Sequence, residues 1–319
     1  MSALLLPRGV PYGNDYARPA SPGWRDIDWA ARERDFSLRG RRVHYVDHGS
    51  GGDTFVLVHG MGGRWQHWLE NIPDLARRGR VIALDLPGFG RSQSPRSGYS
   101  LDGFADAAAA LCRELELKRV VFVGHSLGGP IAIRFAVRHP ELVRAIVPVA
   151  GAVDLFSDVL SVRRMPKAVW ASPSTVPATL FEVLTAGLPA PAPLSRRIAD
   201  SPRLRRLVLW PYLRYPDRVL PDTAALLTDG AGARGVLPTA RAVAGADTFE
   251  GIEKVRCPIL VVNADRDPIS PLSRLDGFAR ATATLETVVI ERTGHMPMLE
   301  RPDAFNAEVG RFLDTLGDC

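Results

Sequence analysis

Six short, almost unbroken hydrophobic runs recur along the chain, at residues 54–60, 80–85, 119–124, 144–151, 257–265 and 285–291. None of them alternates between hydrophobic and polar positions, as a strand with one solvated face would. Continuous runs of β-favouring residues are typical of strands that are buried on both faces of a parallel sheet. The pattern therefore predicts a mostly parallel sheet at the centre of the fold.

Helical patterns fill several intervals between these runs. Residues 101–117 and 127–140 read as helices, and a last helix is expected from Pro302 to Leu313, because proline is favoured in the first turn of a helix. Upstream, residues 35–49 alternate around Gly40, which predicts an antiparallel hairpin at the edge of the sheet. Strands that alternate with helices in this way predict an α/β fold with a doubly wound, mostly parallel sheet.

The alternation stops between Asp154 and Phe249. This stretch is rich in proline and alanine, has no convincing strand, and carries short helical segments with aromatic and leucine side chains. Because the strand pattern resumes at residue 257, a helical insertion between two core strands is a simpler interpretation than an independent domain. We therefore expect an N-terminal arm (1–34), an α/β core in two parts (35–153 and 251–319) and a helical cap or lid (154–250).

The chain has 319 residues and a formal net charge of +5, and arginine supplies nearly all of its positive charge. One denser basic cluster consists of Arg196, Arg197, Arg203, Arg205 and Arg206. It fits either a solvated basic face or a surface that attracts an anionic membrane or an acidic substrate. No basic motif is interleaved with aromatic residues, so we expect no nucleic-acid partner.

The three cysteines, Cys112, Cys257 and Cys319, do not have the spacing of a metal site. The first two lie in hydrophobic segments and are expected to be buried thiols rather than disulfide partners. The N-terminal hydrophobic run is too short for a signal peptide, and no stretch approaches the length of a membrane span. We therefore expect a cytoplasmic protein without an integral membrane segment, which leaves peripheral membrane contact open.

The sequence Gly124-His125-Ser126-Leu127-Gly128 joins a predicted strand to a predicted helix without ordinary turn residues. In such a corner the serine adopts a strained backbone conformation, and its hydroxyl projects above the carboxyl edge of the sheet. The glycines remove side chains that would collide as strand and helix close on each other. Ser126 is therefore the candidate nucleophile, although glycine-rich turns of this kind also occur for packing or for phosphate binding.

A serine nucleophile needs a general base, and the base needs an orienting acid. In this architecture the acid and then the histidine follow the serine along the chain. His139 ends a helix, which is a structural position, whereas His295 lies in a glycine-containing loop after the last strand and is the expected base. Helix capping is the alternative role for the three aspartates that follow strand ends. These candidate acids are Asp154, Asp265 and Asp267.

Acyl transfer also needs backbone amides that bind the negative oxygen of the tetrahedral intermediate. Leu127, directly after the serine, would supply one amide, and Met61, in the turn after the strand at 54–60, would supply the second. His59 and His125 are expected to support these turns rather than to titrate in the reaction. Along a strand, His44 and His48 would lie roughly 13 Å apart, too far to share a metal ion. No metal or other cofactor is expected.

The sequence resembles the α/β-hydrolase superfamily over residues 35–319. The resemblance rests on four motifs that follow one another along the chain: His59-Gly60, the corner at 124–129, the aspartate turn and Gly294-His295. The loop at 85–92 (DLPGFGRS) is similar to the loop that follows an early core strand in that family. Members place the acid in a D-x-[IV]-x-P turn, which residues 267–271 match, with Ala264 where a glycine is usual. The resemblance therefore favours Asp267 as the acid.

Departures from other branches of that superfamily narrow the expected chemistry. Dehalogenase and epoxide hydrolase relatives use aspartate where this chain has Ser126, and C–C hydrolases often have asparagine and tryptophan where it has His125 and Met296. We expect a lipase-like serine esterase that acts on small-molecule esters with a hydrophobic acyl group. The acyl group is expected to bind near Trp65, Met296 and Met298, although these side chains fit a role in the hydrophobic core equally well. The alternatives are a C–C bond or lactone hydrolase on the same triad, or a signalling receptor that binds a ligand without turnover.

Overall fold

A computed structural model of the protein describes residues 7–21, 23–188, 190–229 and 232–317. This part of the chain forms one eight-stranded sheet in the order β1-β8-β7-β6-β5-β3-β2, with β4 paired to β3 beside this path. The strand pairs are parallel except for β2 with β3, which form the expected antiparallel hairpin, and for residues 45–48 of β3, which run antiparallel to β4. The predicted α/β fold with a mostly parallel sheet is confirmed. The strands are β1 (Arg8–Val10), β2 (Glu33–Leu38), β3 (Arg41–Val58), β4 (Gly79–Leu84), β5 (Val120–His125), β6 (Val143–Val149), β7 (Ile259–Ala264) and β8 (Leu285–Ile290).

Strand β3 covers both the second strand of the hairpin and the strand predicted at 54–60, with a glycine-rich segment between them. The two halves run in opposite directions along β4: residues 45–48 pair with Leu84 back to Val81, whereas residues 54–58 pair with Arg80 forward to Leu84. Gly52 has a φ of +53° and lies so close to the neighbouring chain that a Cβ atom there would overlap the carbonyl oxygen of Arg78. The glycines between the halves, three of which have positive φ, reverse the chain, so the two segments pair with β4 as the two elements expected from the sequence.

The N-terminal arm contributes a strand that the sequence pattern does not predict. β1 pairs in parallel with β8, with Val10 opposite Ile290. Three residues followed by a proline are too few to show a hydrophobic period. Further along the arm, the amide of Ala17 donates a hydrogen bond to the carbonyl of Glu300 (2.7 Å), so the arm is attached to the C-terminal part of the core.

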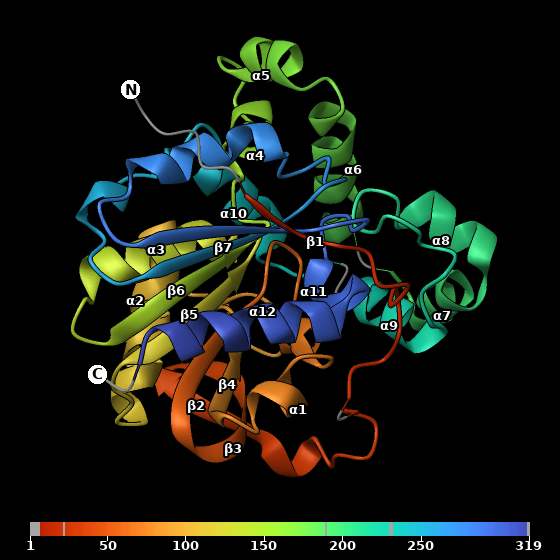
Figure 1. Cartoon of the computed structure of the whole chain (residues 1–319). Coiled ribbons are helices and arrows are strands. Elements are labelled where there is room, and N and C mark those ends of the chain that lie inside the picture. The colour runs from red at the N-terminus through yellow and green to blue at the C-terminus, as the bar shows by residue number, and fades with distance from the viewer. Residues whose placement is uncertain (1–6, 22, 189, 230–231, 318–319) are drawn as a thin grey trace.

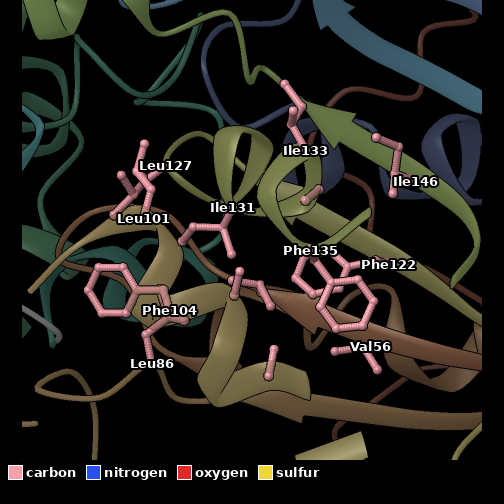
Figure 2. Close-up of a cluster of buried hydrophobic side chains, with 14 of the residues drawn as sticks. Val56, Leu86, Leu101, Phe104, Phe122, Leu127, Ile131, Ile133, Phe135 and Ile146 are labelled. Carbon is pink, nitrogen blue, oxygen red and sulfur yellow. The ribbon is translucent and has the colours of Figure 1, made fainter. Parts of the chain in front are cut away.

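The central strands send alternate side chains into two hydrophobic layers. Val56 and Val58 pack on one face of the sheet with α2 (Leu101–Glu114) and α3 (Gly128–Arg138), and Phe55 packs on the other face with α1 (Ile72–Leu75) and α12 (Pro302–Thr315). In the first layer, Phe122 of β5 lies beside Phe135 of α3, with ring centroids 4.6 Å apart (Figure 2). Because both faces are covered, the strands are hydrophobic throughout.

Between β6 and β7, the described residues form helices and no strand. Proline stands in the first turn of four of them, where the N–H group it lacks would have no partner inside the helix. Figure 1 shows most of these helices along the top and right of the view, away from α2. They are α4 (Asp154–Val159), α5 (Met165–Ala171), α6 (Thr175–Gly187), α7 (Ala192–Asp200), α8 (Pro202–Val208), α9 (Pro221–Thr228) and α10 (Val236–Val243).

The remaining elements are short. They are α11 (Pro297–Glu300) and the 3₁₀ helices η1 (Ala30–Arg32), η2 (Trp65–Trp68), η3 (Ile252–Lys254) and η4 (Leu272–Arg280). No helix in the described ranges is both long and apolar enough to cross a membrane. Cys112 and Cys257 are free thiols, and burial raises the pKa of each to about 12, whereas Cys319 lies outside the described residues.

Candidate active site

Ser126 occupies the corner between β5 and α3. Its φ of +51° lies in the left-handed region, which is uncommon for a residue with a side chain. The backbone amide of Ser126 donates to the carbonyl of Val149 at the end of β6 (2.8 Å), and this bond fixes the corner to the neighbouring strand. The side chain is thus presented at the carboxyl edge of the sheet by a conformation that the surrounding structure enforces.

The flanking glycines are required by close approach of the backbone. A Cβ atom on Gly124 would overlap the carbonyl group of Gly128, and one on Gly128 would lie 2.7 Å from the carbonyl oxygen of Val58. Any larger residue at either position would push helix α3 away from the sheet. The corner therefore depends on the glycine pattern that the sequence shows.

His295 lies in the loop after β8 and is hydrogen bonded to an aspartate from the loop after β7. Its Nδ1 is 2.8 Å from Oδ2 of Asp267, and both side chains are buried. The other carboxylate oxygen of Asp267 accepts hydrogen bonds from the amides of Ile269 (2.8 Å) and Ser270 (2.9 Å). The turn after β7 thus holds the carboxylate in place, and the carboxylate selects the histidine tautomer that has its proton on Nδ1.

The two other candidate aspartates have different partners. Asp154 forms an ion pair with Arg274. Asp265 accepts a hydrogen bond from the amide of Thr293 (3.2 Å) and lies 3.6 Å from the guanidinium of Arg266. Among the three, only Asp267 is hydrogen bonded to His295, as the resemblance implies.

His125 brings the His295 loop to the serine corner. The ring N–H at Nε2 of His125 donates to the backbone carbonyl of His295 (2.8 Å), and the two rings lie 4.8 Å apart. Burial lowers the pKa of His125 well below its ordinary value, so the ring is neutral. Because His125 directly precedes Ser126, this contact places the candidate base beside the candidate nucleophile.

The outer nitrogen of His295 is available for proton transfer. Nε2 is buried and has no hydrogen-bond partner among the described residues. Burial opposes protonation of the ring, but the carboxylates of Asp267, Glu182 and Glu300 outweigh it and raise the pKa of His295 above its ordinary value. A neutral imidazole with a raised pKa is a stronger base than a free histidine.

The turn after β3 lies against the serine corner. A Cβ atom on Gly60 would be 2.8 Å from the Cβ of Ser126, and Met61 and Leu127 line a small pocket together with Ser126. Neither the Met61 amide nor the Leu127 amide donates a hydrogen bond to another atom of the described chain. Two free amides beside the serine match the requirement for an oxyanion site.

His59 stabilises this turn, as expected. Its Nδ1 donates to the carbonyl of Gly60 (2.7 Å), and its Nε2 accepts from the amide of Leu86 (3.0 Å). Burial lowers the pKa of His59 to about 4 and that of His67, in η2, to about 3. Both rings are therefore neutral near pH 7.

Ser126 and His295 open into one cavity of about 370 Å³. Its sheet side also includes Met61 and Met296. Its other side is formed by the insertion and is mostly aliphatic or aromatic. The residues from the insertion are Phe181, Glu182, Thr185, Ala186, Leu188, Ala190, Leu194, Ile198, Val208, Leu209, Tyr212, Leu227 and Thr228.

Two expected substrate contacts are wrong. Trp65 and Met298 do not line the cavity but are buried in the hydrophobic layer of α1 and α12. Trp65 packs against Trp29 of the arm, with ring centroids 5.4 Å apart, and its amide donates to Asp85 (2.7 Å). Of the three predicted contacts, only Met296 lines the cavity, so the core interpretation holds for the other two.

Two buried carboxyl groups near His295 were not predicted. Glu182 of α6 is 2% exposed, lines the cavity, and has its pKa raised to about 7 by burial. Glu300 of α11 accepts from the amides of Gly294 (2.6 Å) and Arg214 (2.6 Å) and from the hydroxyl of Tyr16 (2.8 Å). Glu300 thereby joins the His295 loop, the insertion and the N-terminal arm.

The described residues contain no group of three or more histidine, cysteine or acidic side chains arranged to hold a metal ion. The polar groups around Ser126 are the ring of His295 with its Asp267 partner and the backbone amides of Met61 and Leu127.

Comparisons with known proteins agree with this architecture. Among curated relatives, an uncharacterised protein of Mycobacterium tuberculosis (strain ATCC 25618 / H37Rv) is 30% identical over 272 residues, which cover 83% of this chain and 76% of that protein. A 2-hydroxymuconate semialdehyde hydrolase of Pseudomonas sp. (strain CF600) is 29% identical over 287 residues, which cover 88% of this chain and 93% of that protein.

A solved structure of a bacterial membrane phospholipase A is similar with a TM-score of 0.68 and 24% identity, over 90% of this chain and 87% of that chain. The model of the alpha/beta hydrolase family matches residues 55–308, which is most of the sequence. The chain therefore belongs to the alpha/beta hydrolase family.

Proposed function

We propose that the protein is a serine hydrolase that cleaves carboxylic esters with a hydrophobic acyl group. Ser126 would be the nucleophile, His295 the general base and Asp267 the orienting acid. The hydrogen bond between Asp267 and Nδ1 of His295 carries the proposal, because it leaves Nε2 free in a cavity that Ser126 also lines. Nucleophile, base and orienting acid are the three parts that this chemistry requires.

In the first half of the reaction, Nε2 of His295 takes the proton of the Ser126 hydroxyl as its oxygen attacks the ester carbonyl carbon. The carbonyl oxygen becomes negative and accepts hydrogen bonds from the Met61 and Leu127 amides. The imidazolium then protonates the leaving alcohol, and an acyl-enzyme remains. Water attacks this ester with the same histidine as base, and the carboxylic acid leaves. Asp267 stabilises the charged imidazole in both halves.

The preference for a hydrophobic acyl group is inferred from the side of the cavity that the insertion forms. A cavity of about 370 Å³ lined by leucine, isoleucine, valine and phenylalanine side chains favours an apolar group of moderate size. We infer that residues 154–250 act as a cap over the site, since their helices supply this side while the sheet loops supply the reacting groups.

Hydrolysis of a C–C bond or of a lactone on the same triad is the competing function. The relative named as a 2-hydroxymuconate semialdehyde hydrolase acts, by its name, on a carboxylate-bearing compound. The described cavity lining includes no arginine or lysine, and it does include the carboxyl group of Glu182. An anionic substrate would lose its hydration there without gaining a cationic partner, so the lining favours a neutral ester or lactone.

Turnover of a substrate panel tests the proposal. The purified protein is assayed with nitrophenyl esters of increasing acyl length, with neutral lactones and with a carboxylate-bearing dienoate. We expect the neutral medium-chain esters to give the highest kcat/KM, and Ser126→Ala to lower it by about 10⁴-fold or more. Fluorophosphonate should label the wild type and the control Ser37→Ala, an exposed serine on β2, but not Ser126→Ala.

Each competing function has its own outcome. Faster turnover of the dienoate than of any ester would replace the esterase assignment with C–C hydrolysis. Ligand binding without turnover, in protein that fluorophosphonate does not label, would indicate a receptor.

A further inference from the structure

Helix α6 buries its charged residue and exposes hydrophobic ones, which is the reverse of an ordinary surface helix. Glu182 is its only charged residue and is buried in the cavity. By contrast, Leu180 and Leu184 are 49% and 59% exposed, and Leu188, just after the helix, is 57% exposed. Residues four apart lie on the same side of a helix, so these leucines form an apolar stripe that faces outwards.

Exposed hydrophobic side chains gather in the insertion. Among the described residues, Leu272 is the only exposed large hydrophobic side chain outside residues 154–250. The most exposed is Trp170 of α5, at 90%. The others in the insertion are Val162, Val169, Leu180, Leu184, Leu188, Leu194, Leu207, Trp210, Leu220 and Leu237. A concentration of this kind on one part of a surface marks an interaction site.

This apolar surface reaches the mouth of the candidate active site. Leu188 and Leu194 are both exposed to solvent and line the cavity. Phe181, which also lines the cavity, packs against the exposed Trp210, with ring centroids 5.9 Å apart. A body that covered these side chains would therefore lie next to the entrance for substrate.

The same part of the chain is strongly cationic. Residues 160–215 contain nine arginine or lysine residues and two acidic residues, one of which is the buried Glu182. Arg205 does not belong to the surface cluster expected from the sequence, because it is buried and its guanidinium donates to the carbonyls of Pro216 and Asp217. The exposed cations are Arg163, Arg164, Lys167, Arg196, Arg197, Arg203, Arg206 and Arg214.

We propose that helices α5 to α8 dock onto the surface of an anionic lipid bilayer, with the leucine stripe of α6 and the two tryptophans in the interface. Leucine and tryptophan bordered by arginine and lysine is the composition of segments that lie in a membrane interface. Arginine and lysine can keep their charge among lipid headgroups while their aliphatic parts cover apolar surface. Arg196, Arg197 and Arg203 form no ion pair with other described residues and are free to meet such headgroups.

A second copy of the chain fits this surface less well. A symmetric dimer through α6 to α8 would bring the cationic helices α7 and α8 of both copies together, with few acidic groups to compensate them. A bilayer that contains phosphatidylglycerol supplies the opposite charge over a broad area. Figure 1 shows α5 and α8 at the outer edge of the molecule, where a flat surface can approach them.

Vesicle sedimentation tests the proposal. The full chain is centrifuged with phosphatidylcholine vesicles alone and with vesicles in which about one third of the lipid is phosphatidylglycerol. Wild type should sediment only with the anionic vesicles. Leu180→Ser/Leu184→Ser and Arg196→Gln/Arg197→Gln should each lower the bound fraction by about fivefold or more, because each removes one of the two contributions to binding.

Matched variants outside the surface serve as controls. Leu272→Ser removes an exposed leucine from η4, and Arg39→Gln/Arg96→Gln removes two exposed arginines outside the insertion. Both should bind the anionic vesicles like the wild type. None of the substituted residues lines the cavity that contains Ser126 and His295, so hydrolysis of a short soluble ester should be unchanged in all four variants.

Three outcomes would overturn the proposal. Wild type could fail to sediment with anionic vesicles, or the α6 and α7 variants could bind them as well as wild type does. Alternatively, sedimentation velocity could give a dimer for wild type and a monomer for Leu180→Ser/Leu184→Ser without vesicle binding, which would assign the surface to a second copy. These readouts do not depend on catalysis, so the proposal stands or falls separately from the proposed function.

Discussion

The two sides of the cavity differ in polarity and in the kind of interaction that holds their groups in place. On the sheet side, loops at the ends of β3, β5, β7 and β8 present polar groups, and short hydrogen bonds such as that from the Ser126 amide to Val149 fix them. On the other side, the insertion presents mostly aliphatic side chains from helices and the segments that join them. Packing of such side chains is non-directional and tolerates changes in size better than a hydrogen-bonded site does.

The contrast indicates that the two sides have separate tasks. The sheet side specifies where a proton and a negative charge are held, which requires directional bonds. The insertion specifies the shape and polarity of the bound group. Substitutions on the sheet side should therefore change the rate for every substrate, whereas those in the insertion should change which substrate is preferred.

The sharpest test of the sheet side is Asp267→Asn. Asparagine preserves the shape but no longer holds the His295 tautomer that has its free lone pair on Nε2, so we expect kcat/KM for all esters to fall by about 10³–10⁴-fold. Steady-state kinetics measures the loss. Asp154→Asn, which removes the partner of Arg274 instead, should keep kcat/KM close to that of wild type. A larger loss in Asp154→Asn than in Asp267→Asn would reassign the acid.

Glu300 joins the two sides, and Glu300→Gln should weaken that link. In wild type, the carboxyl oxygens of Glu300 accept hydrogen bonds from N–H and O–H donors. In the variant, the glutamine N–H₂ group would face one of these donors, and the lost hydrogen bond should lower the free energy of unfolding by about 1–3 kcal/mol at pH 5. Urea denaturation measures this difference, and Glu114→Gln, at an exposed site on α2, should be neutral.

The stability difference should depend on pH. Burial raises the pKa of Glu300 to about 7 from an unfolded value of 4.5, so the folded protein binds this proton more tightly than the unfolded chain does. The wild type therefore loses stability as pH rises from 4.5 to 7, and glutamine does not share this loss. The gap between variant and wild type should narrow from pH 5 to pH 8, and a gap that widens would contradict the assigned direction.

A bulkier residue in the insertion should change substrate preference rather than chemistry. Val208→Phe places a ring in the cavity, and we expect kcat/KM for long-chain esters to fall by about tenfold relative to short-chain esters. The ratio across a series of acyl lengths measures this effect. Leu237→Phe places a phenylalanine ring at an exposed site on α10 and should leave the ratio unchanged. An equal loss for all chain lengths in Val208→Phe would argue against separate tasks.

The smallest expected effect is that of Glu182→Gln, the one substitution in the insertion that should act on the base. The Glu182 carboxylate helps to raise the pKa of His295, so its loss should move the acidic limb of the kcat/KM profile to lower pH. The plateau at high pH should change little. A profile that stays in place, with the Glu114→Gln control also unmoved, would show that Glu182 does not act on the base.

Most of the core could be predicted because its signal is local. Strands buried on both faces leave continuous hydrophobic runs, and five of the six predicted runs match separate strands to within two residues at each end. The sixth run, at 54–60, forms the second half of β3, after the glycine-rich segment at which the chain reverses direction along β4. The edge strand β1 left no signal, since three residues cannot show a period.

The candidate site divides in the same way. Ser126, His295 and Asp267 stand in short patterns tied to strand ends, so their neighbourhood follows once the sheet is known. Glu182 and Glu300 have no such pattern, because a glutamate in a helix reads as solvent-exposed unless its tertiary neighbours are known. The choice between core and cavity for Trp65 and Met298 likewise depends on packing that sequence periodicity does not encode.

The left-handed backbone conformation of Ser126 has a consequence for the evolution of this position. Glycine is the residue best suited to that conformation, and a change from serine to glycine would ease the corner while removing its hydroxyl. Genetic drift at this codon therefore favours a more stable protein that has lost its candidate nucleophile. Only selection for the function of the hydroxyl can retain serine, which is less favourable than glycine in this backbone conformation.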